Sequence, residues 1–240
     1  MNWNSGTFRM VYEDTRFMLG KLLFLYITIP LFLVWLAIGY FFGLGGDVVA
    51  AISGPTYFFI PLFAISGFKS IFRVAIGMGS TRVNLLKNFY GIGLAGVLIV
   101  TFLLNILQWI LINAFERWNV SANILHPSVF FNQAYSFLSY YVIDLMIGIF
   151  IFSFTFLFFT IYYRLGFRRS VIWLMVLVIV GMLLNYSGLV QFSLLWDWLA
   201  IQDFNDMAVF SFVILISLIA LFITYPIMRN ASLTAKSKKD

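Results

Sequence analysis

The chain has 240 residues, of which 62% are hydrophobic and only 10% are charged. A soluble domain usually carries about 25% charged residues, so the composition excludes an ordinary soluble fold and predicts a membrane protein. The chain has no cysteine and a single histidine, His126, which excludes disulfide scaffolds, thiolate chemistry and most histidine-dependent metal sites. We therefore expect one all-α membrane domain over residues 1–240, without a metal site.

The first 21 residues are amphipathic. Their mostly apolar face consists of residues that recur at three- and four-residue steps, namely Phe8, Val11, Tyr12, Thr15 and Leu19. Charged side chains lie between these positions, which predicts an interfacial helix over residues 1–21 that contacts the lipid headgroups as an elbow. The alternative is a plain extension of the first membrane span.

Six apolar runs follow, each long enough to cross a bilayer. They cover residues 22–42, 48–68, 89–112, 137–163, 171–190 and 208–228. The runs are continuously apolar and do not alternate, which favours helices over a β-barrel. The pattern predicts a six-helix membrane domain over residues 22–228, followed by a basic tail over residues 229–240.

The basic residues predict how the chain is oriented. All but one of the 15 lysines and arginines fall on the same side of the predicted spans, and the exception is Arg117. Basic residues collect on the cytoplasmic side of membranes, so we expect a multi-pass protein of the cell membrane with both termini in the cytoplasm. The net charge of +6 then indicates contact with anionic lipid, including through the tail, and not with nucleic acid.

The longest cytoplasmic loop, Lys69–Asn88, has its own pattern. Its apolar stripe consists of Ile71, Phe72, Ala75 and Ile76. Gly77 and Gly79 interrupt the stripe, and Ser80 or Thr81 can cap a following helix. The loop is predicted to form a short helix, a glycine turn and a capped helix that continues into the third span.

Polar residues inside the predicted spans are candidate pathway residues. Asp144 is an acidic residue within the fourth span, and it shares a helix face with Tyr140 and Gly148 at four-residue spacing. An ionisable residue at this depth suggests function, unless the span begins late and Asp144 lies near the outer headgroups. Asn105 and Gln108 of the third span would face the same cavity, or form hydrogen bonds between helices.

Neither the glycine motif nor the prolines inside the predicted spans indicate an enzyme. The run Gly91–Gly96 matches G-x-G-x-x-G, but it lies inside a span and lacks the strand that a dinucleotide site needs, so close helix packing is expected. A P-loop is absent from the sequence, so ATP would not be bound by a P-loop of this chain. The prolines Pro30, Pro55 and Pro61 are predicted to kink the first two spans.

The glycine turn carries a resemblance to a known family. The residues in question are Gly77-Met78-Gly79-Ser80-Thr81-Arg82. This stretch resembles the turn that opens the third span in permease subunits of type-two ABC exporters, especially the small Gram-positive type. It departs from that pattern in having Thr81 before Arg82, and Val83 where a second basic residue is common. The layout of elbow, six spans and a short arginine-bearing turn after the fourth span is also similar over nearly the whole chain.

The resemblance implies that the chain is one subunit of a larger transporter. The chain would form half of a pathway for an amphipathic cargo, such as a peptide toxin, an antimicrobial peptide or a lipid-like compound, beside a second permease copy or a homologue. It would hold no cofactor and would not be an enzyme, since separate ABC ATP-binding subunits would bind ATP and Mg. The residues implied in coupling to those subunits are Lys69, Ile71, Phe72, Arg73, Ile76, Gly77, Gly79, Ser80 and Arg82. The arginines would pair with acidic residues of the ATPase, and the apolar side chains would fill its groove.

Other functions stay open at this point. The substrate-binding membrane component of a vitamin uptake system also has about six helices, and a tightly bound small molecule would favour it. A non-transporting immunity or sensor protein would act without an ATPase. An ion-driven carrier usually carries more charges inside its spans than this chain.

Overall fold

The computed structural model describes residues 5–43, 45, 49–120, 123–127, 135–188 and 206–231. This part of the chain is mostly helical, and six of its helices are long and apolar enough to cross a membrane. They are Gly6–Phe42, Gly54–Gly77, Arg82–Arg117, Phe137–Leu165, Phe167–Tyr186 and Ser211–Arg229. The expected all-α architecture with six such helices is confirmed. The predicted basic tail lies outside the described residues after Ala231.

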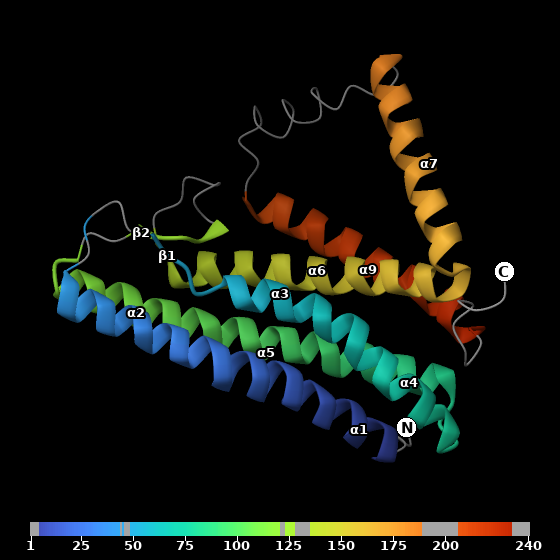
Figure 1. The fold of residues 1–240 in the computed structure, drawn as a ribbon, viewed down its shortest axis with the longest axis horizontal. Helices are drawn as coiled ribbons and strands as arrows, with labels where there is room; N and C mark the ends of the chain where they lie inside the picture. Colours follow the sequence, from blue (N-terminus) through green and yellow to red (C-terminus); the bar gives the residue numbers. More distant parts are fainter. Residues whose placement is uncertain are drawn as a thin grey trace.

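The first helix runs without interruption through the expected elbow. It consists of α1 (Ser5–Thr15), η1 (Arg16–Thr28) and α2 (Ile29–Phe42). In η1 the backbone bonds span five residues, and the hydroxyl of Thr28 likewise donates to the carbonyl of Leu23, five residues earlier, at 3.0 Å. The helix continues past Pro30, which has no N–H to donate. Residues 5–21 therefore extend the first span with no break (Figure 1), and an interfacial position for them stays a prediction.

The second span begins later than expected. Its helix consists of α3 (Gly54–Leu62), η2 (Phe63–Gly67) and α4 (Phe68–Gly77). The expected start at residue 48 is wrong, because Val49–Ala50 forms a short strand, β1, that pairs in parallel with β2, Asn123–Ile124. Pro55 lies in the first helical turn, where its fixed φ and missing N–H cost nothing. Pro61 lies inside α3, directly before the backbone changes to the wider helix of η2.

The predicted helix, glycine turn and capped helix are confirmed. The helix is α4, which continues the second span, and the turn and α5 follow it. Gly79 has a φ of +87°, a conformation that glycine adopts without strain. The side chain of Thr81 then accepts a hydrogen bond from the Asn84 backbone N–H at 3.2 Å and caps α5, Arg82–Arg117. Thr81, not Ser80, is the cap.

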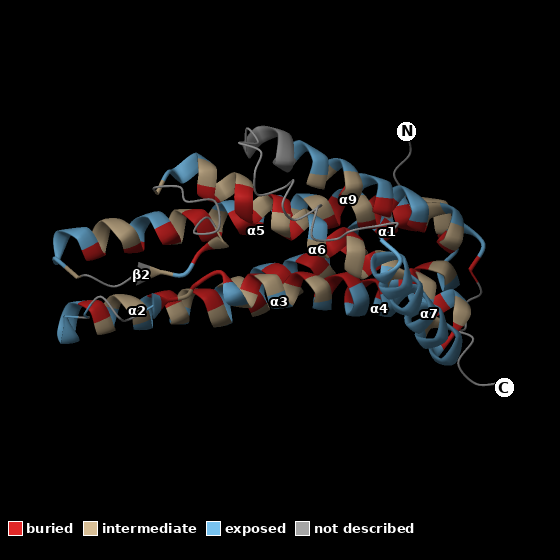
Figure 2. Cartoon of the chain, turned by 90° about the horizontal axis from the view of Figure 1, so that it is seen from above, coloured by how far each residue is buried: buried red, intermediate tan, exposed pale blue. Residues whose placement is uncertain are grey.

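The remaining helices complete a bundle with one outlying member. They are α6 (Phe137–Leu165), α7 (Phe167–Tyr186) and α9 (Asp206–Arg229). The hydroxyls of Tyr90 and Thr224 lie 2.6 Å apart and join α5 to α9. The guanidinium of Arg82 donates to the Arg229 carbonyl at 3.4 Å, so the start of α5 and the end of α9 meet at one end, where α1 also begins (Figure 1). By contrast, α7 points away from the bundle and is exposed along its length (Figures 1 and 2).

Phenylalanine rings fill the centre of the bundle near the end where α1 begins and α9 ends. Phe63 stacks on Phe89 and Phe152 with ring centroids 5.5 and 6.1 Å apart. Phe68 and Phe156 meet edge to face at 5.0 Å. All five side chains are at most 1% exposed. These phenylalanines of the second, third and fourth spans therefore form a packed core and do not line a passage.

Glycines of α5 allow its neighbours to approach closely. A Cβ on Gly93 would lie 2.7 Å from the Cζ of Phe152, and one on Gly96 would lie 2.8 Å from the Cγ2 of Thr15. Both distances are shorter than real Cβ contacts allow, so only glycine fits. This confirms that the G-x-G-x-x-G run serves helix packing.

Replacing Gly93 by alanine is expected to destabilise the protein by about 1–3 kcal/mol, the usual cost of overpacking a core. Phe152 cannot move aside easily, because it packs against Phe63 and Phe89. Gly91→Ala is the matched control, since nothing lies within 4 Å of that Cβ and alanine favours helix. Thermal unfolding in one detergent compares the two variants, and equal melting temperatures would contradict this packing.

Candidate functional site

A carboxylate is buried between three segments of the chain. Asp144 lies on α6, about two turns inside the helix that begins at Phe137, and it is 0% exposed. Its Oδ1 accepts a hydrogen bond from the Tyr57 hydroxyl of α3 at 2.5 Å and lies 2.9 Å from the Nε2 of His126. The helix begins at Phe137 as expected, so the span does not start late, and the depth of Asp144 relative to the headgroups stays a prediction.

Aromatic rings hold His126 in place. Its ring stacks on Tyr140 with centroids 3.8 Å apart and planes 9° apart, and Tyr135 meets Tyr140 edge to face at 4.7 Å. Burial, with smaller contributions from Tyr140 and Glu116, raises the pKa of Tyr135 to about 12. Its hydroxyl therefore stays neutral at physiological pH and adds no charge beside the histidine.

The predicted helix face of α6 is confirmed, and it explains how the site is positioned. Tyr140, Asp144 and Gly148 are all buried. A Cβ on Gly148 would lie 2.9 Å from Val97 of α5 and 3.3 Å from Ile60 of α3. The glycine therefore brings α3 and α5 against α6 one turn below the carboxylate.

The two amides of α5 lie in the same buried half of the bundle. Asn105 and Gln108 are 0% exposed, and the Asn105 amide donates to the Phe137 carbonyl at 2.8 Å. This bond agrees with the alternative of hydrogen bonding between helices. Both amide atoms of Gln108, the Oδ1 of Asn105 and the Oδ2 of Asp144 have no hydrogen-bond partner among the described residues.

The arrangement suits a small polar ligand or a proton better than a metal ion. Buried polar atoms without partners are costly in a protein interior, and Asp144, Asn105 and Gln108 each carry at least one. Within the described ranges, no group of three or more carboxylates and imidazoles is close enough to hold a metal. The cluster can bind hydrogen-bonding groups, and a role for it in a pathway stays a prediction.

Sequence reasoning missed two members of this site. His126 lies outside the six predicted spans, and Tyr57 is not among the candidate pathway residues. Both contact Asp144 only because α3, α6 and the segment after β2 converge. For Tyr57 the sequence offered one signal, which is a hydroxyl-bearing side chain shortly after Pro55 in a mostly apolar span.

The implied coupling residues divide between the core and the surface. Ile71 and Phe72 are only 3% and 2% exposed and belong to the chain's own core, so they have no apolar surface left with which to fill a groove on another subunit. Ser80 is also buried, and Ile76 and Arg82 are half-buried. The exposed members are Lys69, Arg73, Gly77 and Gly79. Val74 and Met78, which the resemblance did not single out, are exposed beside them.

No protein family, curated protein or solved structure was found to match the chain. The likeness to type-two ABC permeases therefore rests on the glycine turn and the layout of the spans. The site is defined by its own geometry.

Asp144→Ala is expected to destabilise the protein more than Asp144→Asn. Alanine removes the acceptor shared by Tyr57 and His126, and each buried donor left unsatisfied costs about 1–3 kcal/mol, whereas asparagine keeps a carbonyl oxygen for the Tyr57 hydroxyl. Melting temperatures of the two variants in the same detergent measure the difference. An alanine variant as stable as the wild type would show that the carboxylate does not hold these segments together.

Proposed function

We propose that the chain is the transmembrane permease subunit of an ATP-driven ABC exporter and forms half of the pathway for an amphipathic cargo. The observation that carries the proposal is the helix–turn–helix of α4 and α5 at the basic end of the bundle. In this unit α4 directly continues the second span and α5 directly continues into the third. A push on the turn would therefore tilt both spans together, as coupling to an ATPase requires.

Exposed residues support contact with another subunit at this turn. Val74 and Met78 are 51% and 64% exposed, and the guanidinium of Arg73 is available for an acidic partner. These side chains, and not Ile71 and Phe72, would meet ABC ATP-binding subunits, which would supply ATP and Mg. The contact would consist of a small apolar patch with a positive charge beside it.

The pathway itself would need a second permease copy or a homologue. In the described part of the chain, the phenylalanine core occupies the centre of the bundle, so a cargo would pass between two subunits and not through one. The cargo class, an amphipathic peptide or a lipid-like compound, follows from the family resemblance alone.

Both chain ends are proposed to lie in the cytoplasm of a cell-membrane protein, since basic residues collect at the end where α1 begins and α9 ends. The chain has no cysteine, so single cysteines report the sidedness. Phe167→Cys is expected to react with a membrane-impermeant maleimide only after permeabilisation, whereas Trp118→Cys at the opposite end should react in sealed right-side-out vesicles. The reverse labelling pattern would invert the topology.

Met78→Asp is expected to abolish co-purification with an ATP-binding subunit from the same genome, because it places a charge in the apolar contact. Phe167→Asp is the matched control on another turn at the same end, since both side chains are 64% exposed. Detergent pull-down of the co-expressed subunits measures the complex. Failure to recover any ATPase with the wild type, or a Met78→Asp complex as stable as the control, would refute the coupling proposal.

A second candidate, the substrate-binding component of a vitamin uptake system, is favoured by the buried polar cluster. The unpaired atoms of Asp144 and Gln108 are groups that a small polar ligand would use. Mass spectrometry of the denatured purified protein tests for a co-purified small molecule. Its loss in Gln108→Leu would support uptake over export, and a protein that lacks both ligand and ATPase would point to an immunity or sensor role.

A further inference from the structure

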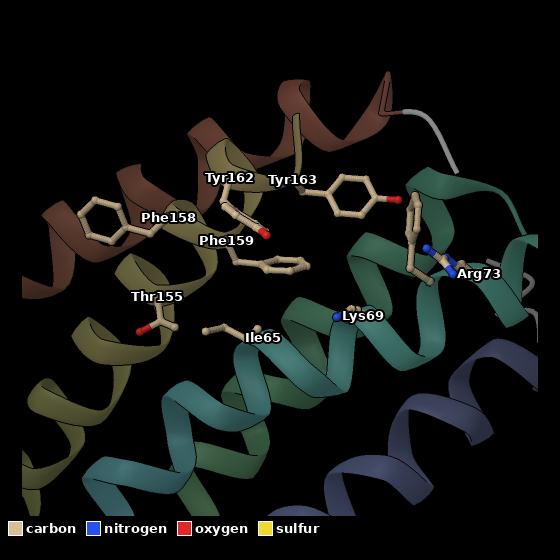
Figure 3. Close-up of a pocket in the computed structure, with 9 residues that line it drawn as sticks. Ile65, Lys69, Arg73, Thr155, Phe158, Phe159, Tyr162 and Tyr163 are labelled. Carbon is tan, nitrogen blue, oxygen red and sulfur yellow. The ribbon is translucent and has the colours of Figure 1, made fainter. Parts of the chain in front are cut away.

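A cavity of about 560 Å³ opens between α4 and α6 near the basic end of the bundle. Figure 3 shows Lys69 and Arg73 on α4 opposite aromatic side chains of α6. Tyr162, Tyr163 and Thr155 add hydroxyl groups to a wall that is otherwise apolar. The cavity therefore combines two cations, three hydroxyls and aromatic surface.

The side chains of Lys69 and Arg73 line the same cavity. Lys69 and Arg73 are four residues apart on one helix, so they project from the same face, and both are exposed. Neither forms an ion pair with a carboxylate in the part of the chain that the structure describes. An anion in the cavity would meet two positive charges that are not neutralised by the protein.

The cavity is amphipathic along its length. Arg73 lies at the end toward the close of α6, where a bilayer has its headgroups, and Ile65, Thr155 and Phe158 lie at the other end, deeper in the span (Figure 3). An occupant would therefore have an anionic group at one end and a hydrocarbon portion at the other. This is the chemistry of an anionic phospholipid, whose phosphate pairs well with a guanidinium.

We propose that this cavity is a binding site for one anionic phospholipid. The phosphate contacts Lys69 and Arg73, and an acyl chain lies along Ile65 and Phe158. Basic pockets between membrane helices on the cytoplasmic side suit such headgroups. Arg73 is shared with the contact proposed for an ATPase, but lipid binding is measured on this chain alone. The site therefore stands or falls independently of the export proposal.

A second cavity of the chain lacks these features. The groove of about 490 Å³ between the first helix and α5 is lined mostly by apolar side chains. Its cation, Arg16, already lies 3.9 Å from the carboxylate of Glu13. This groove can hold an acyl chain from any lipid, so of the two cavities the one with Lys69 and Arg73 is expected to prefer anionic headgroups.

The test uses the purified full chain in phosphatidylcholine nanodiscs that contain increasing amounts of phosphatidylglycerol. Lipid retained after release is counted by native mass spectrometry, and melting temperatures are measured in parallel. Each basic side chain near an anionic headgroup strengthens binding by about fivefold. Lys69→Gln together with Arg73→Gln should therefore weaken phosphatidylglycerol retention by about 25-fold and remove the rise in melting temperature.

Two control variants make the test specific. Lys87→Gln removes an exposed cation outside the cavity and should retain lipid like the wild type, and Arg73→Lys should keep most of the binding. Equal retention by the double variant and the Lys87→Gln control would overturn the proposal. An equal rise in melting temperature with inorganic phosphate alone would identify a free-phosphate site and overturn the lipid assignment, and so would an equal response to phosphatidylcholine.

Discussion

The stack of Phe63, Phe89 and Phe152 is the contact on which the bundle depends, because it joins η2, α5 and α6 in the core. In lipid there is no hydrophobic drive between apolar helices, so dispersion contacts and close fit must hold them. Gly93 provides that fit, since any larger residue would collide with Phe152. Each of α3, α5 and α6 is a continuous helix. This contact therefore also sets the positions of the three helices further along their length.

The half of the bundle that holds Asp144 follows from the same packing. With α3 and α6 fixed by the phenylalanines, Tyr57 and Asp144 face each other across the interface and form their hydrogen bond. The strand pair β1–β2 returns the segment after α5 toward α3, which delivers His126 to the carboxylate. One oxygen of this buried carboxylate thus has partners from segments far apart in the chain. Its other oxygen, the Oδ1 of Asn105 and both amide atoms of Gln108 have no hydrogen-bond partner among the described residues.

At the basic end, burial divides α4 into faces with different uses. Ile71 and Phe72 attach the helix to the core, which makes it a rigid extension of the second span. Lys69 and Arg73 face the cavity beside α6, and Val74 and Met78 face outward at the turn. A lipid in the cavity and a subunit at the turn would therefore contact neighbouring faces of one helix, so occupancy of either would influence the position of the other.

The sequence by itself determined the six spans, their charge asymmetry and the glycine turn before a capped helix, because hydropathy, charge and capping are properties of neighbouring residues. The structure then decided that Thr81, not Ser80, is the cap. The sequence also predicted that Tyr140, Asp144 and Gly148 share a face, since helical periodicity is local. Only the tertiary structure decided that Ile71 and Phe72 are core residues, that the second helix begins at Gly54 and that the first runs unbroken from the N-terminal segment. It alone joined Asp144 to Tyr57, 87 residues away, and to His126, because an apolar stripe or a buried carboxylate does not specify its partner until the helices pack.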